Sequence, residues 1–176
     1  MVQATDAESP IQRLKDWLCS KTGVGIAFSG GMDSSFLAAA AAHWIPNRTE
    51  LFFLDSALIS RSEAETAQSI ALALGFALTK LEVNVLDLPC FQKHPPDRCY
   101  HCKKHLFSQL KAKMSANWVL CDGSNLDDLS EHRPGAKALH ELQIESPLLS
   151  CGFSKDEIRR ELTCWNLTSL IKAPSP

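Results

Sequence analysis

The sequence lacks both the positive charge of a nucleic-acid-binding protein and a long hydrophobic run. Lys and Arg number 18 against 20 Asp and Glu, so the formal net charge is −2 and there is no general basic field. The longest nearly apolar run, residues 36–45, contains His43 and is too short to span a bilayer. The opening MVQATDAESP shows neither the basic nor the apolar segment of a secretion signal. We therefore expect a soluble, cytoplasmic protein that binds neither nucleic acid nor a membrane.

Internal repeats and low-complexity tracts are also missing, and the 176 residues, 45% of them hydrophobic, suit one globular domain with a substantial core. The seven cysteines are an odd number in a chain without a recognisable secretion signal. This pattern favours free thiols, metal ligation or sulfur chemistry over a disulfide framework.

Apolar, strand-like segments alternate with helical segments along the chain. Strands are predicted at residues 23–28, 50–56, 77–84 and 117–125. Helices are predicted at residues 11–20, 33–44, 62–75, 100–114 and 136–142, with another that begins at Ser154. This order predicts an α/β fold, a Rossmann-like, doubly wound parallel sheet of about five strands. Ligands of such folds bind beyond the carboxyl ends of the strands.

The segment SGGMDSS, residues 29–35, lies at such a carboxyl end. Gly30 and Gly31 permit a sharp turn and a close approach of the backbone to a ligand, and Asp33 follows at the positive end of the next helix. The segment lacks the lysine of a Walker motif and the spacing of a dinucleotide fingerprint. It matches the signature S-G-G-x-D-S-S of the PP-loop ATP pyrophosphatases. The simpler alternative is a glycine turn capped by Asp33 and the serines.

This signature implies cleavage of ATP between its α and β phosphates. By resemblance, the phosphates are expected on Ser29, Gly30, Gly31, Met32, Asp33, Ser34 and Ser35. Adenosine contacts are expected from Ala27, Leu54, Asp55, Ser56, Gly123 and Asn125. Such chemistry needs mainly positioning and neutralisation of the leaving pyrophosphate by amides and magnesium. Asp33 could hold Mg²⁺ directly or through water, or could cap the helix.

Two further segments, PPDRCYHCKKHLF and CDGSNLDDLSEHRPGAKALHELQIESPL, complete a resemblance to the LarE family over about residues 25–149. These are ATP-dependent sulfur transferases of nickel-pincer cofactor biosynthesis. The resemblance implies that Asp128 and Arg133 face the site as catalytic residues beside Asp33. Arg133 could bind a phosphate or carboxylate, or pair with acidic residues of its own loop. A strand-to-helix loop rich in caps and turns is the alternative for the second segment.

By the same resemblance, ATP activates a carboxylate of a pyridinium dicarboxylate mononucleotide as an acyl adenylate, and sulfur then displaces AMP. In one form of the family a cysteine of the protein gives up its sulfur, and in another three cysteines hold a [4Fe-4S] cluster. Cys99 and Cys102, at C-x-x-C spacing, point to the cluster form. A zinc half-site, a redox pair and two ordinary thiols remain open.

Members of that family continue into a further cysteine segment and a C-terminal domain, whereas this sequence ends at Pro176. We therefore expect residues 1–176 to form the PP-loop domain, with the sulfur-transfer domain absent. The sequence is then a fragment, a truncated gene product or one half of a split enzyme. Its expected partners are a small-molecule nucleotide substrate and either further copies of the chain, as a homo-oligomer, or a separate C-terminal half. The alternatives are an amide-forming synthetase of the NAD or GMP synthetase type, a tRNA-thiolating enzyme, or a non-catalytic nucleotide-binding remnant.

Overall fold

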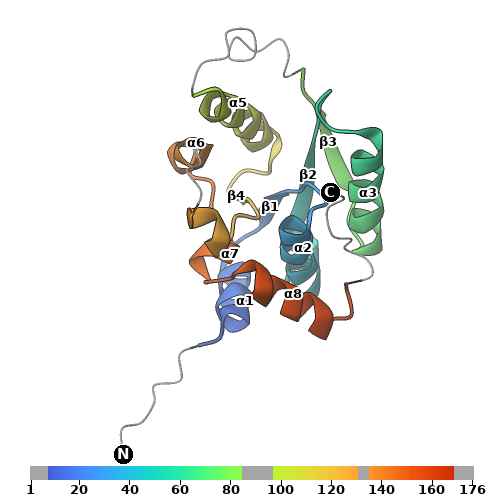
Figure 1. Cartoon of the computed structure of the whole chain (residues 1–176), viewed down its shortest axis with the longest axis vertical. Helices are drawn as coiled ribbons and strands as arrows, with labels where there is room; N and C mark the ends of the chain where they lie inside the picture. The colour runs from blue at the N-terminus through green and yellow to red at the C-terminus, as the bar shows by residue number, and fades with distance from the viewer. Residues whose placement is uncertain (1–7, 85–96, 131–134, 169–176) are drawn as a thin grey trace, which may run out of the picture.

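A computed structural model describes residues 8–84, 97–130 and 135–168 and shows a parallel sheet between layers of helices (Figure 1). The strands are β1 (Val24–Ala27), β2 (Thr49–Asp55), β3 (Leu78–Glu82) and β4 (Val119–Cys121). The α-helices are α1 (Pro10–Ser20), α2 (Met32–Trp44), α3 (Arg61–Ala73), α5 (Arg98–Lys113), α6 (Gly135–Glu141), α7 (Pro147–Ser150) and α8 (Lys155–Cys164). Short 3-10 helices are η1 (Pro46–Arg48) and η3 (Leu126–Ser130). None of the helices in these ranges has the length and apolar character needed to cross a membrane.

The strands form one sheet in the order β3-β2-β1-β4, and all neighbours are parallel. The expected α/β fold with a parallel sheet is therefore confirmed. At the place of a fifth strand, beyond β4, Glu145 forms an isolated parallel bridge with Cys121. The Glu145 amide donates to the Leu120 carbonyl and its carbonyl accepts from the Asp122 amide, both at 3.0 Å. The predicted strand at 117–125 is shortened because residues 122–125 leave the sheet at its carboxyl edge.

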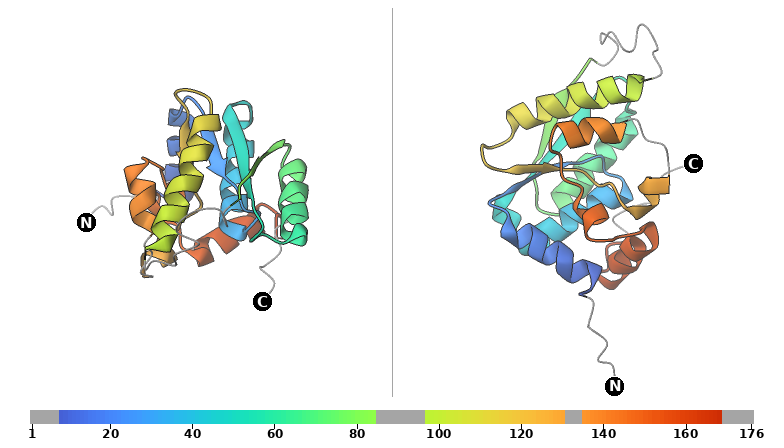
Figure 2. Two further views of the ribbon diagram at one scale, coloured as in Figure 1. Left: turned by 90° about the horizontal axis from the view of Figure 1, so that it is seen from above. Right: turned by 90° about the vertical axis from the view of Figure 1, so that its left-hand side faces the viewer.

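Both faces of the sheet are buried, and successive residues of β2 pack into different hydrophobic cores. Leu51 and Phe53 join the core beneath α1, α2, α3 and α8, whereas Phe52 between them packs with Phe107 and Leu110 of α5 on the other face. Two views at right angles show α5 and α6 apart from the other long helices (Figure 2). This two-sided burial is the doubly wound arrangement expected from the alternating elements.

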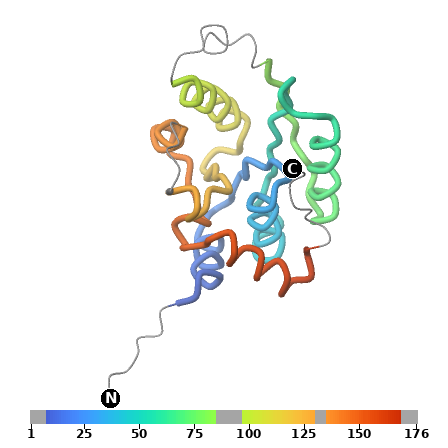
Figure 3. Tube along the Cα trace, viewed as in Figure 1, coloured from blue at the N-terminus to red at the C-terminus, as the bar shows by residue number. Residues whose placement is uncertain are grey.

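Helix α2 runs through the larger core and carries the candidate phosphate loop at its start (Figure 3). Its side chains from Ser34 to Ala41 are all buried, so the helix is enclosed rather than amphipathic. The alanines let α1, α3 and α8 approach closely, since they add little side-chain bulk. The start of α2 is therefore held by packing on several sides.

Helix α8 begins where the sequence predicts. Ser154 is its N-cap and accepts from the Glu157 amide at 3.3 Å, while the Glu157 carboxylate accepts from the Ser154 amide at 2.7 Å. This reciprocal pair satisfies two amides that the helix cannot satisfy itself. It also fixes Lys155, the first residue of α8, at the carboxyl edge of the sheet.

Candidate functional site

The carboxyl ends of β1, β2 and β4 converge on the loop of residues 29–31 that leads into α2. Gly30 has φ +76°, and a Cβ at this position would lie 2.9 Å from the Ala67 Cα of α3. Only glycine suits this turn, because both its φ and its contact with α3 disfavour a side chain. Gly31 differs, since it is exposed with φ −71° and a Cβ there would meet only the Ser29 Oγ, at 3.3 Å.

Ser29 and Ser34 hold this loop in shape. The Ser34 Oγ accepts from the Ser29 amide at 3.3 Å and donates to the Gly31 carbonyl at 3.2 Å. The Ser29 Oγ accepts from the Gly31 amide at 3.3 Å. Gly31 is the N-cap of α2 and offers no side chain to the first amides of the helix, which have no acceptor within it. The loop is therefore preformed, with amides and a positive helix end available to an anion.

The loop after β4 closes onto the same helix start at Gly123. A Cβ on Gly123 would lie 2.9 Å from the Ser34 nitrogen and 3.3 Å from the Asp33 carbonyl carbon. Such a distance is closer than side chains tolerate, so glycine is needed for the contact. Gly123 therefore joins two loops that the sequence separates widely, and it does so within the candidate site.

Asn125 is buried and orients the acidic residues of the site. Its Nδ2 donates to the Asp33 Oδ2 at 2.9 Å, and its backbone amide donates to the Asp128 Oδ2 at 3.0 Å. Its Oδ1 in turn accepts from the Asp127 amide at 2.9 Å. Asp33 and Asp128 are thus brought to the same side of the loop, and Asn125 fixes their positions.

The other carboxylate oxygen of Asp33, Oδ1, is buried and has no hydrogen-bond partner in the described structure. Burial raises the pKa of this carboxyl above its ordinary value; among its neighbours, Lys155 lowers the pKa and Asp128 raises it. An unpartnered carboxylate oxygen in a half-buried position is costly. A cation, or water held by a cation, would satisfy this oxygen, so the geometry fits a magnesium ligand better than a simple helix cap.

A cavity of about 420 Å³ opens in front of the loop. It is lined by Ala27, Ser29, Gly31, Met32, Asp33, Ser34, Lys103, Asp122, Gly123, Ser124, Asp128 and Lys155. Lys103 comes from α5 and Lys155 from α8, and both are half-buried. Neither ammonium group forms a hydrogen bond or ion pair within residues 8–84, 97–130 and 135–168. Unpaired, half-buried lysines beside free helix amides are suited to a phosphate chain.

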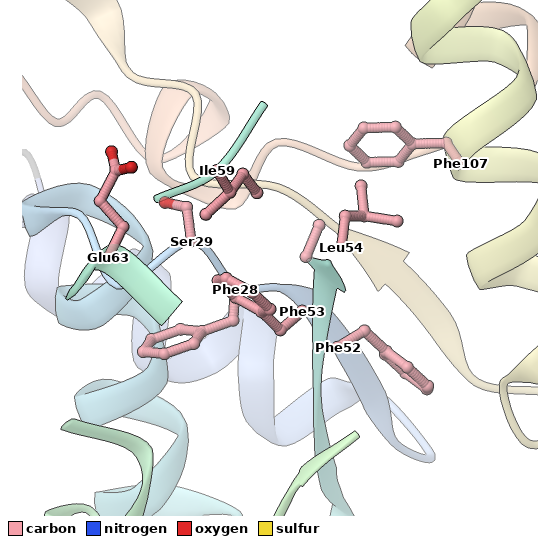
Figure 4. A pocket seen from close by; sticks show the side chains of 9 residues that line it. Phe28, Ser29, Phe52, Phe53, Leu54, Ile59, Glu63 and Phe107 are labelled. Atoms are coloured by element: carbon pink, nitrogen blue, oxygen red, sulfur yellow. The ribbon is translucent and has the colours of Figure 1, made fainter. Parts of the chain in front are cut away.

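A second, apolar cavity of about 310 Å³ adjoins the first at Ala27 and Ser29. It is lined by Ala27, Phe28, Ser29, Phe52, Phe53, Leu54, Ile59, Glu63 and Phe107. Figure 4 shows the lining residues Phe28 and Phe53 at the centre of the view, with Glu63 on one side and Phe107 on the other. A hollow lined in this way by aromatic and aliphatic side chains suits a planar apolar group.

The expected site residues are distributed over three places. Ala27 and Leu54 line the apolar cavity, and Gly123 and Asn125 lie on the loop side near Asp33. Asp55 and Ser56 line a separate hollow with Ala57, Glu82, Val83 and Asn84 at the ends of β2 and β3. Ser35 is fully buried, and its Oγ has no partner in the described structure. Arg133 lies outside the described residues.

Sequence reasoning missed Lys103, Lys155, Phe28 and Phe107. Lys103 directly follows the C-x-x-C pair, and Lys155 directly follows the predicted helix start at Ser154. Neither position signals a phosphate site on its own. Their role in the site depends on how α5 and α8 pack around α2, which local patterns do not specify.

Cys99 and Cys102 lie in the first two turns of α5, Cys99 exposed and Cys102 half-buried. Within the described ranges, no group of three or more His, Cys, Asp or Glu side chains could hold a metal ion. A [4Fe-4S] cluster with an open iron needs three protein thiolates. The other described cysteines form no three-ligand group with this pair, so the described residues do not by themselves fit the cluster.

The fold and this site define a PP-loop nucleotide-binding protein: a doubly wound parallel sheet with an S-G-G-x-D-S-S loop at the start of a central helix. The chain belongs to the asparagine synthase family, whose model matches residues 14–118.

Curated relatives extend the match beyond that model. The chain is 33% identical over 156 residues to an uncharacterized protein of Synechocystis sp., covering 87% of this chain and 58% of the relative. It is 29% identical over 151 residues to the pyridinium-3,5-bisthiocarboxylic acid mononucleotide synthase of Lactiplantibacillus plantarum, covering 81% of this chain and 55% of that protein. The chain thus spans about half the length of the curated relatives it matches.

Solved structures share the fold at low sequence identity. The NMN synthetase of Francisella tularensis superposes with a TM-score of 0.69 at 18% identity, covering 96% of this chain and 76% of that structure. The NH3-dependent NAD synthetase of Campylobacter jejuni has a TM-score of 0.66 at 16% identity, covering 91% and 72%. These similarities establish the fold alone.

Proposed function

We propose that this chain is the ATP-binding, adenylating domain of a sulfur transferase of the LarE type. The observation that carries the proposal is the preformed loop of residues 29–31. This loop faces two lysines whose ammonium groups form no ion pair in the described structure, and it adjoins an apolar cavity of about 310 Å³. The sequence match to the bisthiocarboxylic acid mononucleotide synthase supports the sulfur-transfer class.

In this proposal the adenine base occupies the apolar cavity between Phe28, Phe53 and Phe107, and the triphosphate runs past Ser29 to the start of α2. The α2 amides donate to the β and γ phosphates, and Lys103 and Lys155 neutralise their charge. Gly31 and Gly123 leave room for the phosphates because neither places a side chain against the loop.

The proposed first step forms an acyl adenylate. A carboxylate oxygen of a pyridinium dicarboxylate mononucleotide attacks the α-phosphorus, and the bond from that phosphorus to the bridging oxygen breaks. Pyrophosphate leaves with the electron pair, and amides and lysines of the site stabilise its charge. Bound magnesium supplies additional charge neutralisation at the pyrophosphate, and Asp33, through its unpartnered Oδ1, would hold it.

In the proposed second step, an anionic sulfur nucleophile attacks the acyl carbon, forming a C–S bond while the C–O bond to AMP breaks. Burial raises the pKa of the Cys121 and Cys151 thiols, which disfavours the thiolates needed for attack. Cys99 and Cys102 are two of the three thiolates that we propose for a cluster. We propose that a further domain, of the kind that makes the curated relatives longer than the part matched here, completes the transfer.

Isotope exchange between pyrophosphate and ATP tests the adenylation. We expect exchange that depends on pyridinium-3,5-dicarboxylic acid mononucleotide, because ATP releases pyrophosphate in the first step only when an acceptor carboxylate takes up the adenylyl group. Exchange with nicotinic acid adenine dinucleotide in its place, followed by amide formation with ammonia, would instead support an amide-forming synthetase. Absence of exchange together with absence of ATP binding would contradict any catalytic role of the site.

Replacing Asp33 with asparagine tests the magnesium role. We expect Asp33→Asn to weaken ATP binding about 10-fold or more with magnesium present and little without it, because only the carboxylate holds the ion. Titration calorimetry in each condition measures the difference. Equal losses in the two conditions would support a capping role for Asp33.

The same variant has a stability signature. Because folding raises the Asp33 pKa, the native chain binds this proton more tightly than the unfolded chain. Wild-type stability therefore falls as pH rises from the unfolded value of about 3.9 through the raised native pKa. An asparagine side chain cannot ionise, so the stability of ligand-free Asp33→Asn should fall less than that of the wild type as the pH rises. Thermal melts from pH 4 to pH 7 check this expectation.

A further inference from the structure

A third cavity, of about 400 Å³, lies beside the phosphate cavity and between α5, α6 and η3. Much of its wall is apolar, from Leu129, Leu139, Ile144 and Leu149, with Ala136 and His140 of α6 at exposed positions. It shares Lys103, Ser124 and Asp128 with the phosphate cavity. The two hollows therefore meet at a polar boundary, and the third cavity extends away from it as an apolar pocket.

The boundary between the cavities is held rigidly by Asp122 at the end of β4. Its carboxylate accepts from the Ser124 Oγ at 2.6 Å and from the Ser146 Oγ at 2.7 Å. Ser124 and Ser146 both line the third cavity, whereas Asp122 lines the phosphate cavity. This arrangement lies between the two hollows, and Lys103 borders both of them.

The side chain of Lys103 reaches this boundary by crossing the start of α6 at Gly135. A Cβ on Gly135 would lie 2.6 Å from the Lys103 Cδ and 3.3 Å from its Cε. The aliphatic part of Lys103 thus occupies the space that a side chain at position 135 would take. Next to it, the Lys104 Nζ and the Tyr100 hydroxyl both donate to the Glu141 Oε2 at 2.6 Å, which ties α5 to α6. The position of Lys103 is therefore set by the packing of these helices.

We propose that the third cavity is the acceptor pocket of the adenylation, and that Lys103 guides the acceptor carboxylate to the α-phosphate. This inference rests on the proposed function and locates its second substrate. The ligand class is a planar ring that carries a carboxylate. The ring lies against Leu139 and Ile144, and the carboxylate faces Lys103 at the boundary with the ATP site.

The charges at the boundary favour one orientation of the acceptor. Asp128 contributes negative charge there, but its Oδ2 already accepts from the Asn125 amide. The Lys103 ammonium has no such partner in the described structure, so it is available to a carboxylate that enters from the third cavity. Because Lys103 also lines the phosphate cavity, one cation reduces the repulsion between the attacking carboxylate and the phosphate.

Pyridine-3,5-dicarboxylate, titrated by ligand-observed NMR in the presence of magnesium and α,β-methylene-ATP, tests this pocket. We expect the full 176-residue chain to bind the probe, and Ala136→Trp to weaken binding at least about 10-fold by filling the cavity mouth. Lys103→Gln should weaken the dicarboxylate but not pyridine-3,5-dicarboxamide, which carries no charge. Lys137→Trp is the matched control, because Lys137 is exposed on the same helix and does not line the cavity.

Affinity for α,β-methylene-ATP is measured on the same samples and should change less than about twofold in Ala136→Trp. Wild-type affinity for the dicarboxylate in the Ala136→Trp variant would overturn the pocket assignment. Binding of the ATP analogue without any binding of the dicarboxylate would overturn the acceptor class while leaving the ATP site standing. Binding of the dicarboxylate without the ATP analogue would contradict the proposed function and not the pocket.

Discussion

Replacing Gly31 with valine is expected to lower ATP affinity by about 100-fold or more, equivalent to about 2.7 kcal/mol of binding free energy. Gly31 is the N-cap of α2, and a Cβ added to it would have one neighbour within 4 Å, the Ser29 Oγ at 3.3 Å. A branched side chain would occupy the space in which the phosphates approach the amides. Titration calorimetry with ATP and magnesium measures the loss.

The fold should survive this substitution, because Gly31 has φ −71° and is exposed. Gly31→Ala, which adds one carbon, should give an intermediate affinity. Gly75→Val is a useful comparison. Gly75 follows the C-cap of α3 with φ +85°, and a Cβ added there would meet nothing within 4 Å. Valine at this position should therefore reduce stability through backbone strain but leave ATP binding unchanged. Unchanged ATP affinity in Gly31→Val would exclude the loop as the phosphate site.

Gly123→Val is expected to damage both the fold and the site. Its Cβ would lie 2.9 Å from the Ser34 nitrogen, so the loop after β4 would have to move away from the start of α2. We expect a loss of about 1–3 kcal/mol of unfolding free energy from overpacking, together with a loss of ATP binding of about 100-fold. Denaturant titration and calorimetry measure the two effects separately.

The comparison that separates these effects is again Gly75→Val, which should lose comparable stability far from the loop. If both variants lost ATP affinity to the same degree, instability alone would explain the result. If Gly123→Val kept wild-type affinity, the contact between Gly123 and Ser34 would have no part in nucleotide binding.

Much of the fold could be predicted because its signals are local. The apolar run ELFFLDS between polar segments indicates a buried strand, and Ser154 followed by Glu157 indicates a helix start; β2 and α8 are found at these places. The end of β4 is predicted too late: the expected strand runs to Asn125, although residues 122–125 are the turn formers Asp-Gly-Ser-Asn. In the structure these residues leave the sheet, Gly123 packs on the start of α2, and Asn125 donates to Asp33. That choice depends on tertiary contacts.

The candidate site also combines residues that a local motif predicts with residues that only tertiary packing places. Ser29, Gly30 and Asp33 could be placed from one contiguous motif, since the turn and the helix start are encoded together. The partners of that motif come from elsewhere: Lys103 depends on how α5 packs against α6, and Lys155 on how α8 begins. A lysine on a helix carries no local mark of the cavity it will face, so sequence patterns cannot distinguish these from solvent-exposed lysines.

The strand order has a consequence for how the protein acquires its site. β1 pairs with β4 as well as with β2, so Ile26 lies beside Cys121. In the sequence, β2, β3 and α5 all lie between these two residues. Parallel pairings over such sequence separations form slowly, because loop closure precedes the gain from contact. During synthesis the phosphate loop can therefore emerge early, while Gly123 and Asn125 complete it only after β4 has inserted. The ability to bind nucleotide should accordingly appear late in folding, so ATP binding would report the insertion of β4 into the sheet.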